Sequence, residues 1–414
     1  MLRKEDARAV AERVARTSYG RLVAFLAFRT RDVASAEDAL SEAFAAALTT
    51  WPVQGCPDNP EAWLLTTARR KVIDSARHRV RGEDVARALG ILMEGASSEA
   101  AEIPDQRLAL LFVCAHPAIE EGIRAPLMLQ VILGLDAKSI ASAFLASPSA
   151  MGKRLVRAKE KIRKAGIPFE IPTADAWPSR VHSVLEAIYV TFSEGWSDPG
   201  GVDLARRGLT GEALFLARMV VDLLPNSAEA LGLLALMLHA EARLPARRDA
   251  TGAYVPLPKQ NDRRWNTDLM MEAEGLIRRA AELNDIGRYQ LEAALQSAHT
   301  FRRKTGHSNW SEVVHLYDAL MAVAPSPVVA MNRALAVAEV NGPDAGLALL
   351  PDPANDSRLL EYQPYWAARA ELLRRRGSVD LARDAYDVAI GLERDEAVRR
   401  FLQRRRDGLS TIDS

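Results

Sequence analysis

The stretch Leu135–Gly166, LDAKSIASAFLASPSAMGKRLVRAKEKIRKAG, decides how the first part of this chain folds. It holds two apolar patterns at helical spacing, separated by the sequence Ala146-Ser147-Pro148. The residues of these patterns are Ile140, Ala143 and Phe144 in the first, and Met151, Leu155, Ala158 and Ile162 in the second. The spacing predicts two short helices joined by a tight turn.

The second of these helices is strongly basic on the side away from its apolar stripe. Its cations are Lys153, Arg154, Arg157, Lys159, Lys161, Arg163 and Lys164, against the single acid Glu160. Ser147 or Ser149 can cap the helix, and Pro148 is tolerated in its first turn. The pattern is typical of a helix-turn-helix whose second helix, residues 150–165, lies in a DNA major groove. The alternative interpretation is a solvated basic face, which surface helices often carry.

The composition is that of a globular protein with more than one domain. The chain has 414 residues, 48% of them hydrophobic and 26% charged, with a formal net charge of zero. Residues 1–170 hold 25 Lys and Arg against 21 Asp and Glu, a surplus too small to identify a nucleic-acid binder. Local clusters of basic residues are more informative than this surplus, because electrostatic contacts with phosphates act over about 8–10 Å.

The termini and the cysteines point to a cytoplasmic protein. The charged start MLRKEDARAV lacks the apolar core of a signal peptide, and no apolar run of about 18 residues occurs. Cys56 and Cys114 are the two cysteines, too few for a disulfide framework or a zinc-ligand pattern. We therefore expect a chain of the reducing cytosol.

Nearly the whole sequence has helical periodicity, which predicts an all-α fold. Within residues 5–50, a helix beginning at Ser35 has a capping-box pattern with Asp38. Its polar face, with Glu37, Asp38, Ser41 and Glu42, is acidic. The segment 51–60, WPVQGCPDNP, holds three prolines and a glycine and predicts a loop.

A second basic cluster lies on a helix expected from about Glu61 to Val80. Trp63 stands at its start, and Asp74 is its one acid beyond the first turn. The basic side chains are Arg69, Arg70, Lys71, Arg77, His78 and Arg79. A basic groove with an aromatic side chain at one end suits a single strand of nucleic acid. Trp63 is also well placed to be a core anchor, and we favour that role.

After residue 178 the sequence predicts repeated pairs of helices. The clearest pair spans residues 363–396, and weaker pairs span 209–243 and 326–350. The 363–396 pair has the tetratricopeptide spacing of small and aromatic residues at Trp366, Ala370, Gly377, Ala382, Tyr386 and Ala389. Such pairs stack because one alone does not bury its apolar face, and the stack offers a groove to a partner.

With these features in this order, the chain resembles the group IV (extracytoplasmic-function) sigma factors of bacterial RNA polymerase, members of the sigma-70 family. The likeness extends to a subgroup with a long C-terminal extension through RLALLFVCAHPAI (107–119), YVTFSEGW (189–196) and LYDALMAVAPSPVVAMNRALAVAEVNGP (316–343). The resemblance implies region 2 at 1–81, a linker at 82–105, region 4 at 106–170 and a helical-repeat extension at 179–410. It also implies that this extension regulates the protein.

The resemblance assigns roles to the clusters. Core polymerase would bind the acidic helix through Asp38, Leu40, Glu42 and Phe44. The melted −10 element would bind Trp63, Arg69, Arg70, Lys71, Arg77 and His78. The duplex −35 element would bind Ser149, Lys153, Arg154 and Arg157. Relatives often have Asn where this chain has Arg70, so the −10 base preference is expected to differ.

We expect no enzymatic activity, no metal and no cofactor. The seven histidines form no ligand or catalytic pattern, and G-x-S-x-G, P-loop and dinucleotide motifs are absent from the sequence. The expected partners are core polymerase, promoter DNA and a protein regulator at the C-terminal domain, with no membrane. Two alternatives stay open: a helix-turn-helix regulator with a repeat sensor that does not join the polymerase, and a repeat scaffold that binds acidic proteins.

Overall fold

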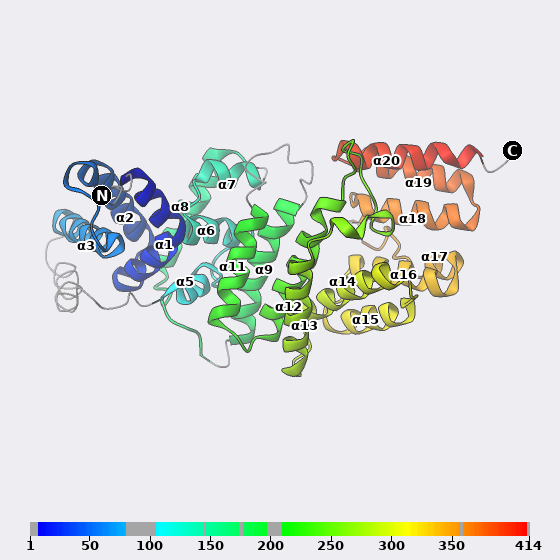
Figure 1. The fold of residues 1–414 in the computed structure, drawn as a ribbon, viewed down its shortest axis with the longest axis horizontal. Helices are drawn as coiled ribbons and strands as arrows, with labels where there is room; N and C mark the ends of the chain where they lie inside the picture. The colour runs from blue at the N-terminus through cyan, green and yellow to red at the C-terminus, as the bar shows by residue number, and fades with distance from the viewer. Residues whose placement is uncertain are drawn as a thin grey trace. The chain divides into compact units, whose positions relative to one another are not determined.

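A computed structural model of the chain describes residues 7–79, 105–144, 146–173, 177–196, 209–356 and 359–411. These residues form an all-α protein, as the periodicity predicts, with one isolated β-bridge between Arg248 and Tyr254 and no strand among them. Figure 1 shows the helices in chain order. The chain forms two compact units, which divide within the stretch from Gly195 to Leu214. Each unit is described by itself.

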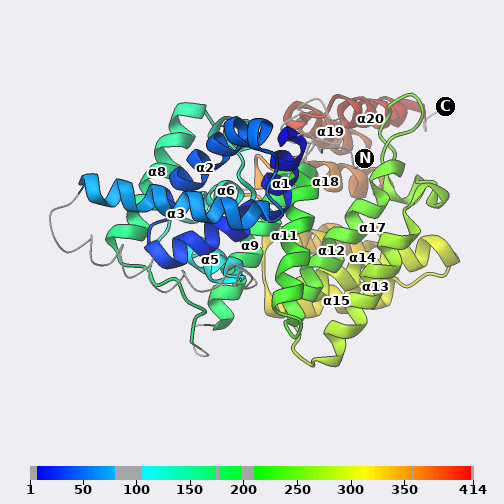
Figure 2. The same ribbon diagram turned by 60° about the vertical axis from the view of Figure 1, so that its left-hand side comes forward.

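The first unit contains the N-terminal helices and the predicted helix-turn-helix. Its helices are α1 (Ala7–Thr30), α2 (Val33–Gln54), α3 (Pro60–Arg79), α5 (Arg107–Cys114), α6 (Glu121–Leu133), α7 (Ala137–Ala143), α8 (Pro148–Lys164) and α9 (Trp177–Trp196). The helices α1, α2 and α3 pack against one another (Figures 1 and 2). Leu22, Leu40 and Leu64, one from each helix, are completely buried and form the centre of this group.

Helix α2 differs from the sequence prediction at both ends. Its N-cap is Asp32, whose carboxylate accepts a hydrogen bond from the backbone N–H of Ser35 at 3.2 Å, so the helix starts at Val33 rather than at Ser35. The predicted loop at 51–60 is wrong for its first residues, because α2 continues through Pro52 to Gln54. The continued turn buries Trp51, which compensates for the backbone hydrogen bond that a proline lacks.

The expected helix-turn-helix is present as α7 and α8. The carboxylate of Asp136 accepts from the backbone N–H groups of Lys138 and Ser139 at the start of α7. Ser147 caps α8 with its hydroxyl on the N–H of Ala150, and Pro148 takes the first helical position, as predicted. The predicted apolar stripe of α8 is buried.

Two glycines let α6, the helix before the helix-turn-helix, pack closely on α1. At Gly20 in α1, an added Cβ would lie 2.3 Å from the backbone oxygen of Ile132 in α6. At Gly134, which ends α6 in the left-handed conformation with φ 71°, it would lie 3.1 Å from the ring of Tyr19. The unit therefore depends on close backbone approach between α1 and α6.

Helix α9 belongs to the first unit. The Arg180 guanidinium donates to the backbone carbonyl of Phe112 in α5, and the ring centroids of Phe112 and Trp177 lie 5.4 Å apart. The sequence predicted that the C-terminal extension starts at residue 179. In the structure the start of its first helix contacts α5, through the Trp177 ring and the Arg180 guanidinium.

The second unit is a series of helices ending near the C-terminus. After α11 (Leu209–Leu223), which begins in the first unit, follow α12 (Ala228–Arg243), α13 (Thr267–Glu282), α14 (Arg288–Thr305), α15 (Trp310–Val323), α16 (Pro327–Asn341), α17 (Pro343–Leu349), α18 (Gln363–Arg376), α19 (Val379–Leu392) and α20 (Glu396–Asp407). The 3-10 turns η1 (Leu244–Ala246), η2 (Leu257–Lys259) and η3 (Asp262–Arg264) separate α12 from α13, and η5 (Gly408–Thr411) follows α20.

Helix α12 lies at the centre of this unit's first half. It is buried on nearly every side and packs against α13 and α14 (Figures 1 and 2). Gly232 permits the close approach of α14, since an added Cβ would lie 2.5 Å from the backbone nitrogen of Gln290. The Glu229 carboxylate accepts from the N–H groups of Tyr289 and Gln290 at 3.2 and 3.1 Å. A negative charge at a helix N-terminus is stabilised by the helix dipole.

The helix pair expected over 363–396 is present as α18 and α19. Four of its predicted positions, Ala370, Ala382, Tyr386 and Ala389, share one buried cluster, and Trp366 packs against it. Gly377 ends α18 in the left-handed conformation, with φ 86°. The weaker pair at 326–350 is α16 with α17, and that at 209–243 is α11 with α12.

Candidate nucleic-acid interface

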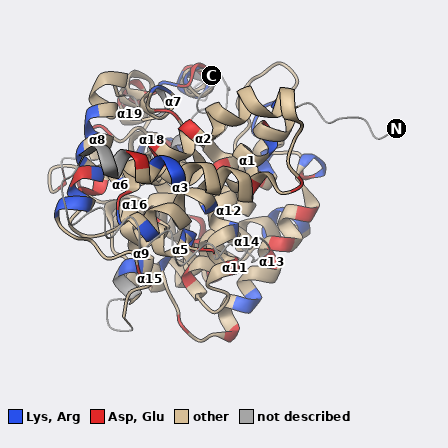
Figure 3. Cartoon of the chain, turned by 90° about the vertical axis from the view of Figure 1, so that its left-hand side faces the viewer, with Lys and Arg blue, Asp and Glu red and all other residues tan. Residues whose placement is uncertain are grey.

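The outer face of α8 is exposed and basic. Ser149, Lys153 and Arg157 are exposed, on the side opposite the buried stripe. In Figure 3 the cations of this helix are drawn in blue. Successive side chains four residues apart lie on one face of a helix, so these three present their polar groups together. They are three of the four residues proposed for the −35 element.

Arg154, the fourth, lies at the edge of that face. Its guanidinium forms an ion pair with the carboxylate of Glu120 at 3.0 Å, just before α6 begins. Half-exposed pairs of this kind contribute about 0–1 kcal/mol, so Arg154 is tethered weakly. This ion pair joins α8 to the residue that directly precedes α6.

Lys159 does not lie on the solvated basic face to which the sequence pattern assigned it. Its ammonium group donates to the carboxylate of Glu37 in α2 at 2.8 Å. The two side chains are only 13% and 10% exposed. Glu37 was likewise predicted on the open acidic face of its helix, and that placement is wrong. Lys159 is four residues after Leu155 and three before Ile162, which places it at the margin of the buried stripe.

Burial dominates the electrostatics around Glu37. Desolvation raises the pKa of the Glu37 carboxyl, and Lys159 partly opposes that shift. The pKa of the Tyr19 phenol is raised by burial first and by Glu37 and Asp38 second. Burial, with Glu37 nearby, also raises the pKa of the Cys114 thiol. These directions agree with the low exposure of the two side chains of the ion pair.

The start of α3 carries an aromatic pair. The rings of Trp63 and Trp51 meet edge to face, with centroids 5.4 Å apart and planes at 69°. Trp63 is half-buried, and Trp51 beneath it is almost completely buried. The contact fits the core-anchor role and leaves part of the Trp63 ring accessible.

The described cations of α3 differ in their surroundings. The Arg69 guanidinium lies 5.1 Å from the centroid of the Phe25 ring, and burial together with Arg29 lowers its pKa. Arg70 is exposed. Lys71 forms an ion pair with Glu42 of α2 at 3.1 Å. Arg70 and Lys71 are thus both exposed, and Arg69 is half-buried.

Two further −10 candidates, Arg77 and His78, have side chains outside the described residues. The predicted linker lies outside them as well from residue 82 to residue 104. The side chains of α3 are therefore described as far as Asp74.

The α2 candidates for polymerase binding divide into two groups. Asp38 and Glu42 are exposed, one turn apart. Leu40 is completely buried in the helical core, and Phe44 is half-buried. Leu40 therefore packs in the helical core, and the surface that α2 exposes to a partner is acidic.

A buried polar cluster in the second unit was not predicted from the sequence. His239 is completely buried, and burial with Arg243 and Lys304 lowers its pKa to about 4. His299 has its pKa lowered to about 4 by burial, Arg302 and Arg243. Arg243 donates to the side-chain oxygen of Gln296 at 2.5 Å. The sequence signal was weak, because these residues come from two helices more than 50 positions apart.

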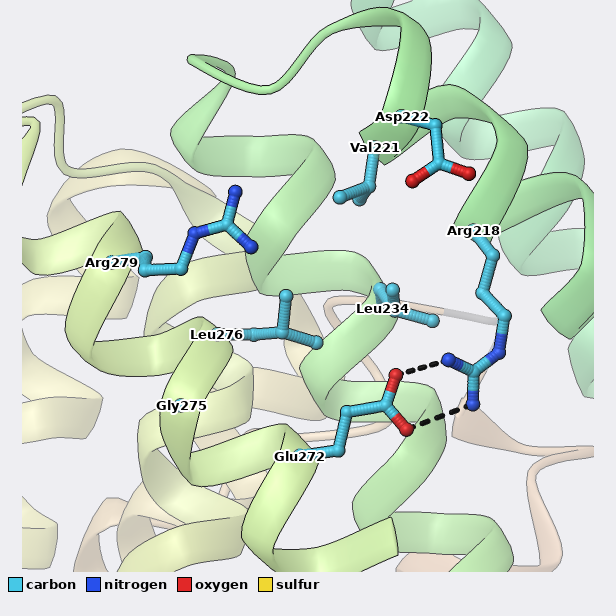
Figure 4. Close-up of a pocket in the computed structure, with 8 residues that line it drawn as sticks. All are labelled: Arg218, Val221, Asp222, Leu234, Glu272, Gly275, Leu276 and Arg279. Carbon is cyan, nitrogen blue, oxygen red and sulfur yellow. Dashed lines mark hydrogen bonds and ion pairs between the residues drawn. The ribbon is translucent and has the colours of Figure 1, made fainter.

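The second unit also holds a cavity of about 370 Å³, shown in Figure 4. On one wall Arg218 forms a two-pronged ion pair with Glu272. Its lining residues are Arg218, Val221, Asp222, Leu234, Glu272, Gly275, Leu276 and Arg279. The cavity thus has an apolar floor and charges of both signs around it.

Comparison with known proteins assigns the N-terminal part of the chain. Residues 15–82 match Sigma-70 region 2, and residues 180–281 match a family of unknown function, DUF6596. The Sigma-70 match covers most of α1 and all of α2 and α3, and α2 and α3 carry the acidic and the basic surfaces described above. The DUF6596 match includes every residue that lines the cavity. No solved structure matches the chain.

The chain therefore carries a Sigma-70 region 2 domain in its N-terminal part, a domain that supports a sigma-70 family sigma factor. A relative from Rhizobium meliloti (strain 1021), Uncharacterized protein R00370, is 36% identical over 392 residues. The alignment covers 92% of this chain and 91% of the relative, so the two belong to one family. Among the described residues, no helix is long and apolar enough to cross a membrane.

Proposed function

We propose that this chain directs promoter-specific transcription initiation as a group IV sigma factor that binds DNA at two points. In this proposal α3 holds melted strand near −10, and α8 reads duplex near −35. The observation that carries it is the exposed basic face of α8 within the same compact unit as the Sigma-70 region 2 helices. Basic side chains at the start of an exposed second helix suit the major groove.

The acidic surface of α2 is the proposed docking surface for core polymerase. Asp38 and Glu42 are both exposed and lie one turn apart, which suits a basic partner. The chain would contribute specificity, and the polymerase would carry out the chemistry. On this proposal the protein is not itself an enzyme.

The test is initiation by purified core polymerase with the full-length chain as its sole specificity subunit, on a library of randomised upstream DNA. A sigma factor yields transcripts that share upstream sequence. DNA binding without initiation would identify a helix-turn-helix regulator, and a chain that does neither would support the scaffold alternative. The variant Arg157→Ala should lower initiation while core binding persists, whereas Arg278→Ala, an exposed arginine of α13, serves as the control.

We further propose that the C-terminal helices regulate this activity and that they form a tetratricopeptide-like array. The support is the α18–α19 pair, whose small residues at the helix crossing are buried as such a repeat requires. The structure suggests where to divide the chain: a form ending at Ala213 keeps the first unit whole, including α9. Promoter output that equals that of the full chain, with folding verified by circular dichroism, would contradict a regulatory role.

A further inference from the structure

The outward face of α8 carries one large apolar side chain among its charges. Val156 is 61% exposed, and the exposed residues around it are Lys153, Arg157 and Glu160. A β-branched residue on an exposed helical position lowers helix propensity relative to lysine or arginine and gains no packing in return. The structure of α8 alone therefore gives no reason for a valine at this position.

The geometry leaves the methyl groups of Val156 open to approach. Gly152 lies one turn earlier on the same side, and a Cβ added there would meet no atom within 4 Å. Its missing side chain thus relieves no crowding inside the protein. The helix surface beside Val156 is therefore shallow at Gly152, with Lys153 and Arg157 along one side of it.

We propose that Val156 contacts the 5-methyl group of a thymine in the DNA that α8 enters. Thymine is the one base that presents a methyl group in the major groove, and apolar side chains recognise it by contact. Lys153 and Arg157 hold the helix in the groove through phosphate or guanine oxygens. Gly152 allows the base edge to approach. This inference rests on the proposed function and names one chemical feature of the DNA site.

Replacing single thymines by deoxyuridine tests the contact, because the exchange removes the methyl group and keeps every hydrogen-bonding group. Duplexes are first selected from a random library with the full-length chain, alone and bound to core polymerase. Affinities of the selected duplex are then measured with each thymine replaced in turn. Removing one buried methyl group should weaken wild-type binding roughly three- to tenfold at one or two positions.

The variant Val156→Ala must lose that sensitivity. We expect it to bind the thymine and deoxyuridine duplexes equally and the thymine duplex more weakly than the wild type does. Val340→Ala is the matched control, since it truncates an exposed valine of α16 in the second unit and should keep the deoxyuridine effect. Val156→Thr, which keeps one methyl group, should retain part of it.

The outcomes separate this inference from the proposed function. A selected duplex whose deoxyuridine forms affect the wild type and Val156→Ala alike would overturn the valine contact and leave the sigma-factor proposal standing. If no duplex is selected in either condition, both proposals fail together.

Discussion

Lys159 of α8 and Glu37 of α2 form an ion pair at 2.8 Å, although 122 positions separate them in the sequence. The pair ties the proposed DNA-reading helix to the proposed polymerase-docking helix. Both side chains are nearly buried, so water screens their interaction little. Asp38, the neighbour of Glu37, is exposed. The same helix thus offers one acid to a partner and one to α8.

We predict that Lys159→Met destabilises the first unit more than Glu37→Gln does. Removing Lys159 leaves a buried carboxylate without its cation, which costs about 3–5 kcal/mol. Glutamine resembles the protonated form that burial of Glu37 already favours, as the raised pKa indicates. Hydrogen exchange at the amides of α2 and α8 in the full chain measures both effects. An equal loss of protection in the two variants would contradict this explanation.

The Lys159→Met variant should also regain stability in acid. Without Lys159 the folded-state pKa of Glu37 rises further above its unfolded value, because the group that opposes desolvation is gone. A raised carboxyl pKa contributes stability below the unfolded value and loses it as pH rises through the folded one. Protection of α2 and α8 in this variant, relative to wild type, should therefore improve from pH 7 toward pH 5. The double variant Glu37→Gln, Lys159→Met should show no such trend.

The second unit should be sensitive to acid through its two buried histidines. The pKa values of His239 and His299 fall to about 4 in the folded chain. A depressed pKa means that stability is present above the unfolded value of about 6.5 and is lost as pH falls toward 4. Each histidine should cost about 1 kcal/mol between pH 6 and pH 5. Unfolding of the unit followed at several pH values measures the slope, and His239→Gln with His299→Gln should remove most of it.

Alanine at Gly20 should destabilise the packing of α1 on α6. The added Cβ would lie 2.3 Å from the backbone oxygen of Ile132, which forces the helices apart at a cost of about 1–3 kcal/mol. Gly211 in α11 is the matched control, because its Cβ would meet nothing within 4 Å and alanine there should stabilise by up to about 1 kcal/mol. Thermal unfolding of the first unit compares the two. Equal behaviour of both variants would show that the close approach is not needed.

If α8 binds DNA phosphates, Arg157→Ala should change the salt dependence of binding. Removing one cation that neutralises a phosphate lowers the slope of log affinity against log salt by about one. Titrations of a selected duplex at several salt concentrations measure that slope. The exposed Arg278 of α13 is the control, and Arg278→Ala should leave the slope unchanged.

Local patterns predicted much of the fold. The α8 stripe, the Ser147 cap with Pro148, and the α18–α19 pair follow from spacing and capping chemistry within one or two helical turns. The prediction failed at Pro52, where the burial of Trp51 outweighs the preference of proline for a loop. It also failed at Glu37 and Lys159, because the periodicity of one helix does not reveal which other helix covers its margin.

The sequence by itself determined an all-α chain with an acidic helix, two basic helices and helix pairs after residue 178, since these features depend on neighbours a few residues apart. Only the tertiary structure decided that Lys159 is paired with Glu37, that α9 packs on α5, and that Val156 remains exposed. Each of these depends on contacts between distant segments, and burial follows from what covers a side chain. The charge of a helix follows from its sequence, whereas the packing of other helices against it decides whether that charge is accessible to a partner.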